Sequence, residues 1–253
     1  SAASDVYKRQ GSGVIISKDG YIITNNHVID GANTITVTLK NGKSYTAKLI
    51  GKDSQVDVAL LKIEETGLSP VTFGDSDNLK VGETAVAIGN PLGKLGGTVT
   101  SGIISALNRE ITIDGETMNL LQTNAAINPG NSGGGLFNAN AELVGLVVAK
   151  SSGSDVEGLG FAIPINDVVN ILQDLMDHGY VTGRPSLGVS LTDISEEQLF
   201  SYRLDEAGTY VAQVTSGSAA EKAGIKLGDL LVKIDDTEIT SSSQAASLIS
   251  KHK

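Results

Sequence analysis

Apolar and polar positions along the first two thirds of the chain form short segments that are typical of β-strands. Residues 11–29 show an apolar run, a Lys-Asp-Gly turn and a second apolar run, which predicts a hairpin. Residues 34–50 repeat this pattern, with alternating threonines and aliphatic residues before Asn41-Gly42. Further β-rich segments follow up to residue 164. Many short strands in succession favour a sandwich or barrel over alternating strand–helix units.

The first long helical pattern appears only at residues 166–179. Asn166 is the expected N-cap, and a glycine follows His178 at the other end. His178 is therefore interpreted as a helix-end residue and not as a catalytic group. The apolar positions of this helix that recur at helical spacing are Val168, Ile171, Leu172, Leu175 and Met176.

These patterns predict a mainly β protein with four segments. Residues 1–10 lack a strand pattern, and residues 11–178 form the first domain. Residues 179–186 contain Gly, Pro and Ser and read as a linker. Residues 187–253 are again β-rich around a short alanine-rich helix, and they end in a second, amphipathic helix.

Composition narrows the chemistry. The formal net charge is −10 without a basic cluster, which argues against nucleic acid as a partner. No cysteine is present, so disulfides, thiolate nucleophiles and zinc–thiolate sites are excluded. The three histidines, His27, His178 and His252, show no metal-ligand spacing, so neither a metal nor another cofactor is expected.

The glycine-rich stretch "GNSGG" at residues 130–134 contains a candidate nucleophile, Ser132. Taken alone, such a segment is more often a turn. It also matches the G-x-S-x-G elbow of α/β-hydrolases, an alternative that requires a helix after the serine and the chain order Ser, Asp, His. Here a strand-like segment follows Ser132, and only His178 and His252 lie downstream. The hydrolase alternative therefore fails.

His27 and Asp57 complete a different arrangement. His27 follows the second strand of the first hairpin, and Asp57 stands at the start of an apolar run, whereas Asp53 is an ordinary turn residue. A serine hydroxyl needs a histidine as base, and the histidine needs a carboxylate to orient it. The chain order His-Asp-Ser is that of chymotrypsin-like enzymes, which place their site between two β-barrels. The N–H groups of Gly130 and Ser132 are then the expected oxyanion donors, with Asn131 shaping the turn.

The sequence closely resembles the HtrA (high-temperature-requirement) serine proteases, which are chymotrypsin-like enzymes that carry PDZ domains. The matching stretches include "GYIITNNHVI", "DVALLKI", "AIGNPLG", "QTNAAINPGNSGG" and "GFAIPIN", and they cover nearly all of residues 11–167. His27, Asp57 and Ser132 fall on the triad motifs of the family. The resemblance implies a chymotrypsin-like double β-barrel followed by a C-terminally truncated PDZ domain.

The resemblance also implies a function. It indicates an ATP-independent serine endopeptidase that cleaves unfolded or damaged proteins in extracytoplasmic quality control, either anchored to a membrane or secreted. Trimers are usual in the family, so a homotrimer is expected for the full-length protein. The alternative is a chaperone-like or peptide-binding module with a latent protease site. Residues 107–119 and 150–158, which are polar and contain glycine, are candidate sensor and activation loops.

Substrate preference is expected from the residue six positions before the nucleophile, Ala126, which sets the floor of the specificity pocket in this fold. Ile127, Val148 and Lys150 are the other expected pocket residues. No acid lies in residues 125–127 or 145–150, so a buried substrate Lys or Arg would lack a partner. Cleavage is therefore expected after small aliphatic residues, with Lys150 as a group that could admit an acidic residue.

In the PDZ-like segment, the stretch Ser186, Leu187, Gly188 and Val189 matches the loop that binds peptide carboxylates in the family. Since the segment stops in its second helix, only weak capture of peptide C-termini is expected. Two positions depart from the family pattern near the nucleophile. Gly135 replaces a common proline, and Asn124 replaces a common aspartate.

Overall fold

The computed structural model describes residues 10–90, 97–113, 116–128, 130–149, 159–183 and 187–250. These residues divide into two compact units. The first unit contains the residues up to Ile113 and Thr117–Thr182, and the second consists mainly of the residues from Gly183 onwards. Lys150, Ser186 and the expected activation loop at residues 150–158 lie outside the described residues.

The N-terminal half of the first unit is a five-stranded antiparallel sheet with the order β1-β2-β5-β4-β3. A short helix, α1, follows β2. The elements are β1 (Val14–Ile15), β2 (Tyr21–Thr24), α1 (Asn26–Ile29), β3 (Ile35–Thr38), β4 (Ser44–Asp53) and β5 (Val58–Lys62). Strand β3 alternates half-buried and exposed residues as its sequence predicts. One cluster of buried side chains belongs to this half of the first unit: Ile22, Ile29, Ala47, Ala59, Leu61 and Ile63.

The second sheet has seven strands in the order β10-β7-β8-β9-β12-β11-β6. Because β10 also pairs with β11, six of these strands close into a barrel, and β6 adds in parallel to β11. The elements are β6 (Thr72–Phe73), η1 (Ser76–Asn78), β7 (Thr84–Gly89), β8 (Thr98–Ile113), β9 (Glu116–Thr123), β10 (Gly135–Phe137), β11 (Glu142–Val148) and β12 (Gly160–Pro164). The second sheet thus forms one of the barrels that the sequence predicts, and the mainly β fold is confirmed.

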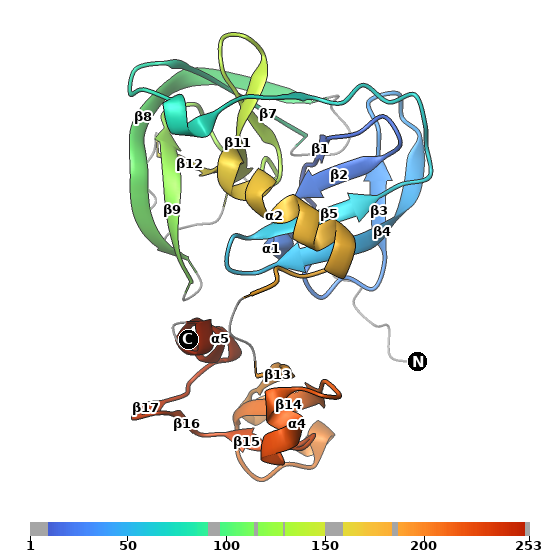
Figure 1. The fold of residues 1–253 in the computed structure, drawn as a ribbon, viewed down its shortest axis with the longest axis vertical. Helices are drawn as coiled ribbons and strands as arrows, with labels where there is room; N and C mark the ends of the chain where they lie inside the picture. Colours follow the sequence, from blue (N-terminus) through green and yellow to red (C-terminus); the bar gives the residue numbers. More distant parts are fainter. Residues whose placement is uncertain are drawn as a thin grey trace. The chain divides into compact units, whose positions relative to one another are not determined.

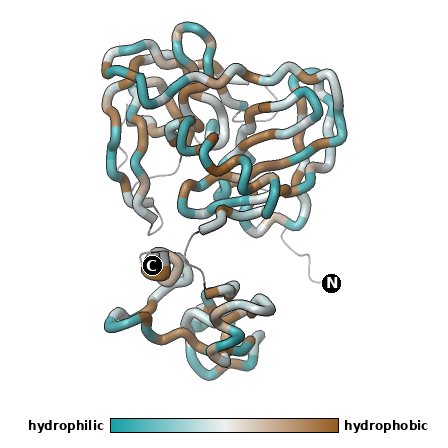
Figure 2. Tube along the Cα trace, in the orientation of Figure 1, coloured by the Kyte–Doolittle hydropathy of each residue, from teal (hydrophilic) through white to brown (hydrophobic). Residues whose placement is uncertain are grey.

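Helix α2 (Ile165–His178) packs against strands of both sheets, namely β4 and β5 of the first and β11 and β12 of the second (Figure 1). Its buried face joins the largest core cluster, which draws side chains from both sheets. Brown and teal positions alternate along the helix and the strands in Figure 2, as expected for elements with one apolar face. The helix therefore fixes the two sheets to each other.

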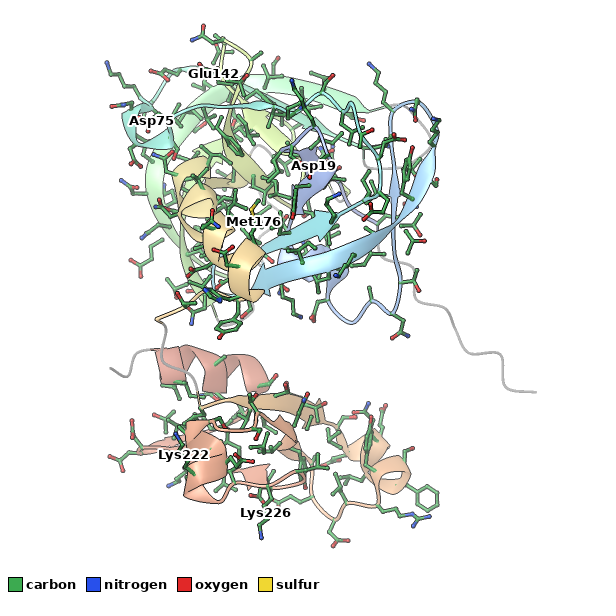
Figure 3. All side chains as sticks on the ribbon, turned by 45° about the vertical axis from the view of Figure 1, so that its right-hand side comes forward. Asp19, Asp75, Glu142, Met176, Lys222 and Lys226 are labelled. Carbon is green, nitrogen blue, oxygen red and sulfur yellow. The ribbon has the colours of Figure 1, made fainter. Side chains whose placement is uncertain are left out.

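The ends of α2 differ from the sequence prediction in one respect. The C-terminus is as predicted: Gly179 adopts the left-handed conformation, and its N–H donates to the carbonyl of Leu175. The predicted N-cap is wrong, because the helix begins at Ile165, before Asn166. The Asn166 side chain instead donates to Asp75 and accepts from the N–H of Ser76. Met176, which is labelled in Figure 3, is also more exposed than predicted. Its exposed fraction is 38%.

The predicted loop at residues 107–119 is a second difference. Strand β8 runs to Ile113 and β9 begins at Glu116, so most of this segment belongs to two long neighbouring strands. Thr112 and Thr117 hydrogen bond to each other across the pair through their hydroxyl groups. Polar residues on exposed strands resemble a loop in the sequence, which explains the error.

The second unit contains a three-stranded sheet with the order β13-β14-β15 and a β16–β17 hairpin. Helix α5 contacts β13 and β16. The elements are β13 (Val189–Ile194), η2 (Glu196–Gln198), α3 (Leu199–Tyr202), β14 (Gly208–Val214), α4 (Ala219–Ala223), β15 (Leu230–Leu231), β16 (Lys233–Ile234), β17 (Thr237–Glu238) and α5 (Ser242–Ser250). Strand β13 lies at the edge of its sheet and α5 lies beside it.

Candidate active site

His27 and Asp57 meet because strands β2 and β5 are antiparallel neighbours, with Thr24 opposite Ala59. The end of β2 and the start of β5 therefore lie at the same edge of the sheet. His27 follows β2 on α1, and Asp57 directly precedes β5. The Nδ1 atom of His27 lies 2.6 Å from Oδ2 of Asp57. The backbone N–H of His27 also donates to Oδ1 of Asp57, at 2.9 Å.

The carboxylate of Asp57 is buried, with only 4% of the residue exposed. Asp57 has a φ of 57°, a left-handed conformation that aspartate tolerates better than most residues. Its carbonyl accepts hydrogen bonds from the side chain of Asn25 (3.1 Å) and the N–H of Asn26 (3.2 Å). These contacts hold the acid in place. Asp53 is the last residue of β4 and not a turn residue as predicted; it is also buried, and its carboxylate accepts from the N–H of Val56 in the turn that follows.

Ser132 reaches His27 from the second sheet. Its Oγ lies 3.1 Å from Nε2 of His27, and it accepts a hydrogen bond from the N–H of Ala149 at 2.8 Å. Since an ionised carboxylate only accepts hydrogen bonds, the Asp57 contact places the imidazole proton on Nδ1. Nε2 then carries the lone pair that can accept the single proton of the Ser132 hydroxyl. The arrangement can transfer that proton to His27 when the oxygen attacks an electrophile.

The backbone around Ser132 turns sharply. The N–H of Gly133 donates to the carbonyl of Val147, and the N–H of Gly134 donates to the carbonyl of Asn131. Gly133 has a φ of 81°, and a Cβ at this position would overlap the Ser12 carbonyl and the Thr24 hydroxyl. Only glycine fits here. The glycines of the motif therefore have a structural role in presenting Ser132.

Two N–H groups near Ser132 find no acceptor among the residues that the structure describes. Within the described part of the chain, the N–H groups of Gly130 and Ser132 do not donate to any backbone or side-chain oxygen. The Asn131 residue between them is 3% exposed, and its own N–H donates to the carbonyl of Asn128. Two unpaired donors that flank a hydroxyl group form a suitable environment for a negatively charged oxygen.

The four expected pocket residues occupy different environments. Ala126 is exposed, and its carbonyl accepts from the Thr100 hydroxyl. Ile127 packs against the core of the second barrel, and its Cγ1 approaches Gly160 so closely that no side chain fits there. Val148 is 2% exposed and belongs to the large core cluster. Lys150 is outside the described residues.

In the second unit, the carbonyls of Leu187 and Gly188 face the loop and helix that follow β14. The Leu187 carbonyl accepts from the N–H of Ala220, and the Gly188 carbonyl accepts from the N–H of Thr215. Val189 begins the edge strand β13. The described part of the expected carboxylate-binding stretch therefore leads directly into an edge strand. Ser186 lies outside the described residues.

Several residues at the first site escape sequence analysis. The side-chain amide of Asn25 donates to the carbonyl of Asp57, and the backbone N–H of Ala149 donates to the hydroxyl of Ser132. Neither residue type indicates such a contact in the sequence. Ser12 and Thr24 form further hydrogen bonds behind the nucleophile loop. Ser12 stands between two glycines in "GSG", which reads as a loop.

In the described ranges, no group of three His, Asp or Glu residues could hold a metal ion, and no helix is long and apolar enough to span a membrane.

The fold and this geometry define a class of protein. A family model for the trypsin-like peptidase domain matches residues 11–146, and one for the PDZ domain matches residues 185–253. The molecule is thus a trypsin-like peptidase domain joined to a PDZ domain.

Individual relatives narrow the class. "Serine protease Do-like HtrB" of Bacillus subtilis is 49% identical over 258 residues, which cover 95% of this chain and 56% of the relative. "Periplasmic serine endoprotease DegP" of Escherichia coli is 45% identical over 236 residues, which cover 91% of this chain and 49% of the relative. The solved structure "HtrA-type protease AlgW with decapeptide" has a TM-score of 0.65 and 40% sequence identity to this chain. The match covers 96% of this chain and 75% of the solved chain.

These comparisons show that the chain belongs to the HtrA-type serine proteases with a PDZ domain. The chain spans only about half the length of the curated relatives that it matches.

Proposed function

We propose that the protein is a serine endopeptidase in which Ser132, His27 and Asp57 act as a catalytic triad. The observation that carries the proposal is the continuous contact from Asp57 through His27 to Ser132, at 2.6 and 3.1 Å. Ser132 attacks the peptide carbonyl while His27 accepts its proton and later donates it to the leaving amine. Asp57 fixes the imidazole and stabilises its protonated form.

The oxyanion of the tetrahedral intermediate would be held by the N–H groups of Gly130 and Ser132, with Asn131 shaping the turn between them. The proposal is supported by the lack of any other acceptor for these two groups in the described part of the chain. One such donor is typically worth a factor of about 10²–10³ in rate.

The substrates we propose are unfolded or damaged polypeptides. A direct test compares degradation of unfolded casein with that of a stably folded protein of similar size. Wild type should degrade casein selectively, and Ser132→Ala should abolish cleavage without lowering the unfolding midpoint. Equal degradation of both substrates would contradict the proposed selectivity. Retained activity in Ser132→Ala would remove the triad assignment.

We further propose that cleavage follows small aliphatic residues such as Val, Ala, Ile or Leu. Ala126 would form the pocket floor, and Ile127, Val148 and Lys150 its surroundings. The close approach of Ile127 to Gly160 supports a narrow pocket. Two substrate side chains that differ by one methylene differ in binding free energy by only about 1–3 kcal/mol, so the enzyme should discriminate only modestly between them. Mapping the cut sites of unfolded casein by mass spectrometry tests this, and predominant cleavage after Lys, Arg or Phe would refute it.

A second candidate function, binding of polypeptides without cleavage, is favoured by the second unit. Edge strand β13 has α5 beside it, an arrangement in which a peptide can add as a further strand. The stretch at residues 186–189 would then receive the peptide C-terminus. A chaperone-like role predicts that Ser132→Ala still suppresses aggregation of an unfolded protein in the absence of proteolysis.

We also propose that the full-length protein is a homotrimer that works outside the cytoplasm, anchored or secreted. The location is supported by relatives that are named periplasmic serine proteases. The trimer rests on the family resemblance alone. Sedimentation equilibrium of the full-length protein tests it, and a monomer at all concentrations would contradict it.

A further inference from the structure

Ser12 lies where three segments of the first unit meet behind the nucleophile loop. Its hydroxyl donates to the carbonyl of Gly130 at 2.7 Å and accepts from the N–H of Asn90 at 2.7 Å. Its backbone N–H donates to the carbonyl of Ser132 at 2.8 Å. Its own carbonyl accepts from the Thr24 hydroxyl at 2.6 Å. One residue thus connects the first sheet, the end of β7 and the loop that carries Ser132.

These hydrogen bonds hold the two residues whose N–H groups are the proposed oxyanion donors. The Gly130–Asn131 peptide is fixed at both ends, because Ser12 binds its carbonyl and Asn128 binds its N–H. A peptide unit is planar, so fixing both groups fixes the orientation of the whole unit. On the other side of Asn131, the Ser132 carbonyl is held by the Ser12 N–H.

The hydroxyl is the part of Ser12 that a substitution can remove. Without it, the Gly130 carbonyl and the Asn90 N–H would both lose their partner in a partly buried location. Gly130 has a φ of 97° and lacks a side chain to restrain it. The Gly130–Asn131 peptide would then keep its N–H contact with Asn128 but lose the contact at its carbonyl, so its orientation would be less well fixed. The Ser12 N–H contact to Ser132 would remain, so the nucleophile itself should stay near His27.

We propose that Ser12 is a positioning residue, whose hydroxyl holds the nucleophile loop so that the Gly130 and Ser132 N–H groups point at the developing oxyanion. The inference rests on the proposed peptidase function. Ser12 does not touch the substrate or the reacting atoms in this account. It acts through the backbone of the loop.

The test measures kcat and KM on a peptide substrate with valine before the cut bond, using wild type, Ser12→Ala, Ser12→Thr and the control Ser17→Ala. Ser17 lies in the same hairpin, where its hydroxyl accepts from the N–H of Tyr21, away from the loop. Ser12→Ala should lower kcat about 10–100-fold with KM changed less than about threefold, because the donors act in the transition state. Ser12→Thr, which keeps the hydroxyl, should recover most of kcat, and Ser17→Ala should match wild type.

A peptide boronate, which binds serine peptidases as a tetrahedral anion, separates positioning from general destabilisation. Its inhibition constant should rise in Ser12→Ala by about the factor that kcat/KM falls, as expected for a transition-state mimic. The pH dependence of the rate should stay unchanged, since Ser12 does not contact His27. If Ser12→Ala fails to fold, Ser12→Cys replaces it, because the weaker thiol donor should give an intermediate kcat.

An unchanged kcat in Ser12→Ala, or a lower kcat with unchanged boronate affinity, would overturn the inference while leaving the triad intact. A wild type that neither cleaves the peptide nor binds the boronate would instead remove the proposed function on which the inference rests. The two failures are therefore distinguishable.

Discussion

The two units of the chain bury their apolar side chains to very different degrees. The first unit has three clusters of buried side chains, one within each sheet and one between the sheets and α2. Among the side chains described in the second unit, the buried apolar ones are Ile194, Tyr210, Val211, Ala220 and Ala245. Phe200 is 94% exposed and Leu227 is 73% exposed in that unit.

This difference matches what each unit is proposed to do. A triad requires side chains held within a fraction of an ångström, and dense packing on both sides of the site supplies that rigidity. In the first unit, the barrel closes through the β10–β11 pair, directly after the nucleophile loop. The second unit keeps β13 as a sheet edge, which suits binding of an extended peptide through its backbone.

We expect catalysis to depend on the first unit alone, and substitution of Asp57 should have the largest effect on the rate. Asp57→Asn should lower kcat about 10⁴-fold, because an amide permits the wrong tautomer of His27. Asp53→Asn is the matched control, a buried aspartate at the end of β4, just before the turn that contains Asp57. Asp193→Asn is the control in the second unit, where the carboxylate accepts from Thr209 and Ser242. Steady-state cleavage of a short peptide measures all three, and a larger loss in either control would contradict the assignment.

The packing difference itself predicts an effect of intermediate size. Leu146→Ala, at a fully buried position of the first unit, should reduce the free energy of unfolding by about 2–5 kcal/mol. Leu231→Ala, at a half-buried position of the second unit, should cost clearly less because less apolar contact is lost. Hydrogen exchange with peptide-level resolution assigns each loss to its unit. Equal losses would remove the distinction between the units.

The smallest expected effect concerns the acid that anchors the start of α2. The amide of Asn166, together with the N–H of Asp77, holds the pKa of Asp75 below its usual value of 3.8. A lowered pKa means that the unfolded chain binds the proton more readily than the folded one. The stabilisation is therefore present above about pH 3.8 and is lost as the pH falls through the folded-state value.

Asp75→Asn should accordingly lower the unfolding midpoint slightly at pH 7, and the difference from wild type should shrink as the pH is lowered below 3.8. Thermal unfolding followed by circular dichroism measures it. A difference that grows towards low pH would show that the sign is wrong.

Much of the fold follows from local patterns in the sequence. The hairpins around residues 18–20 and Asn41-Gly42 form where turn residues separate apolar runs. His27 could be selected because the chain has only three histidines, and Asp57 because packing does not explain a carboxylate at the start of an apolar strand. Ser132 stands out because glycines surround it. The structure brings all three together. Their catalytic role stays a prediction.

The features that the sequence does not predict depend on tertiary contacts. Asn166 looks like an N-cap, but its side chain forms hydrogen bonds with Asp75 and Ser76, which are about 90 residues away in the chain. Ser12 looks like part of a loop, and its partner Gly130 is 118 positions downstream. Short-range patterns contain no information about such pairs. The same holds for Ala149, whose contribution comes from the backbone.

The most direct test of the central claim is reaction with a serine-directed fluorophosphonate followed by peptide mapping. We predict a single adduct on Ser132 in wild type, no adduct in Ser132→Ala, and a labelling rate at least about 10²-fold lower in His27→Ala, because His27 is the proposed base. Asp53→Asn should be labelled like wild type. An adduct on another residue, or a labelling rate that does not depend on His27, would contradict the claim that these residues act as one catalytic unit.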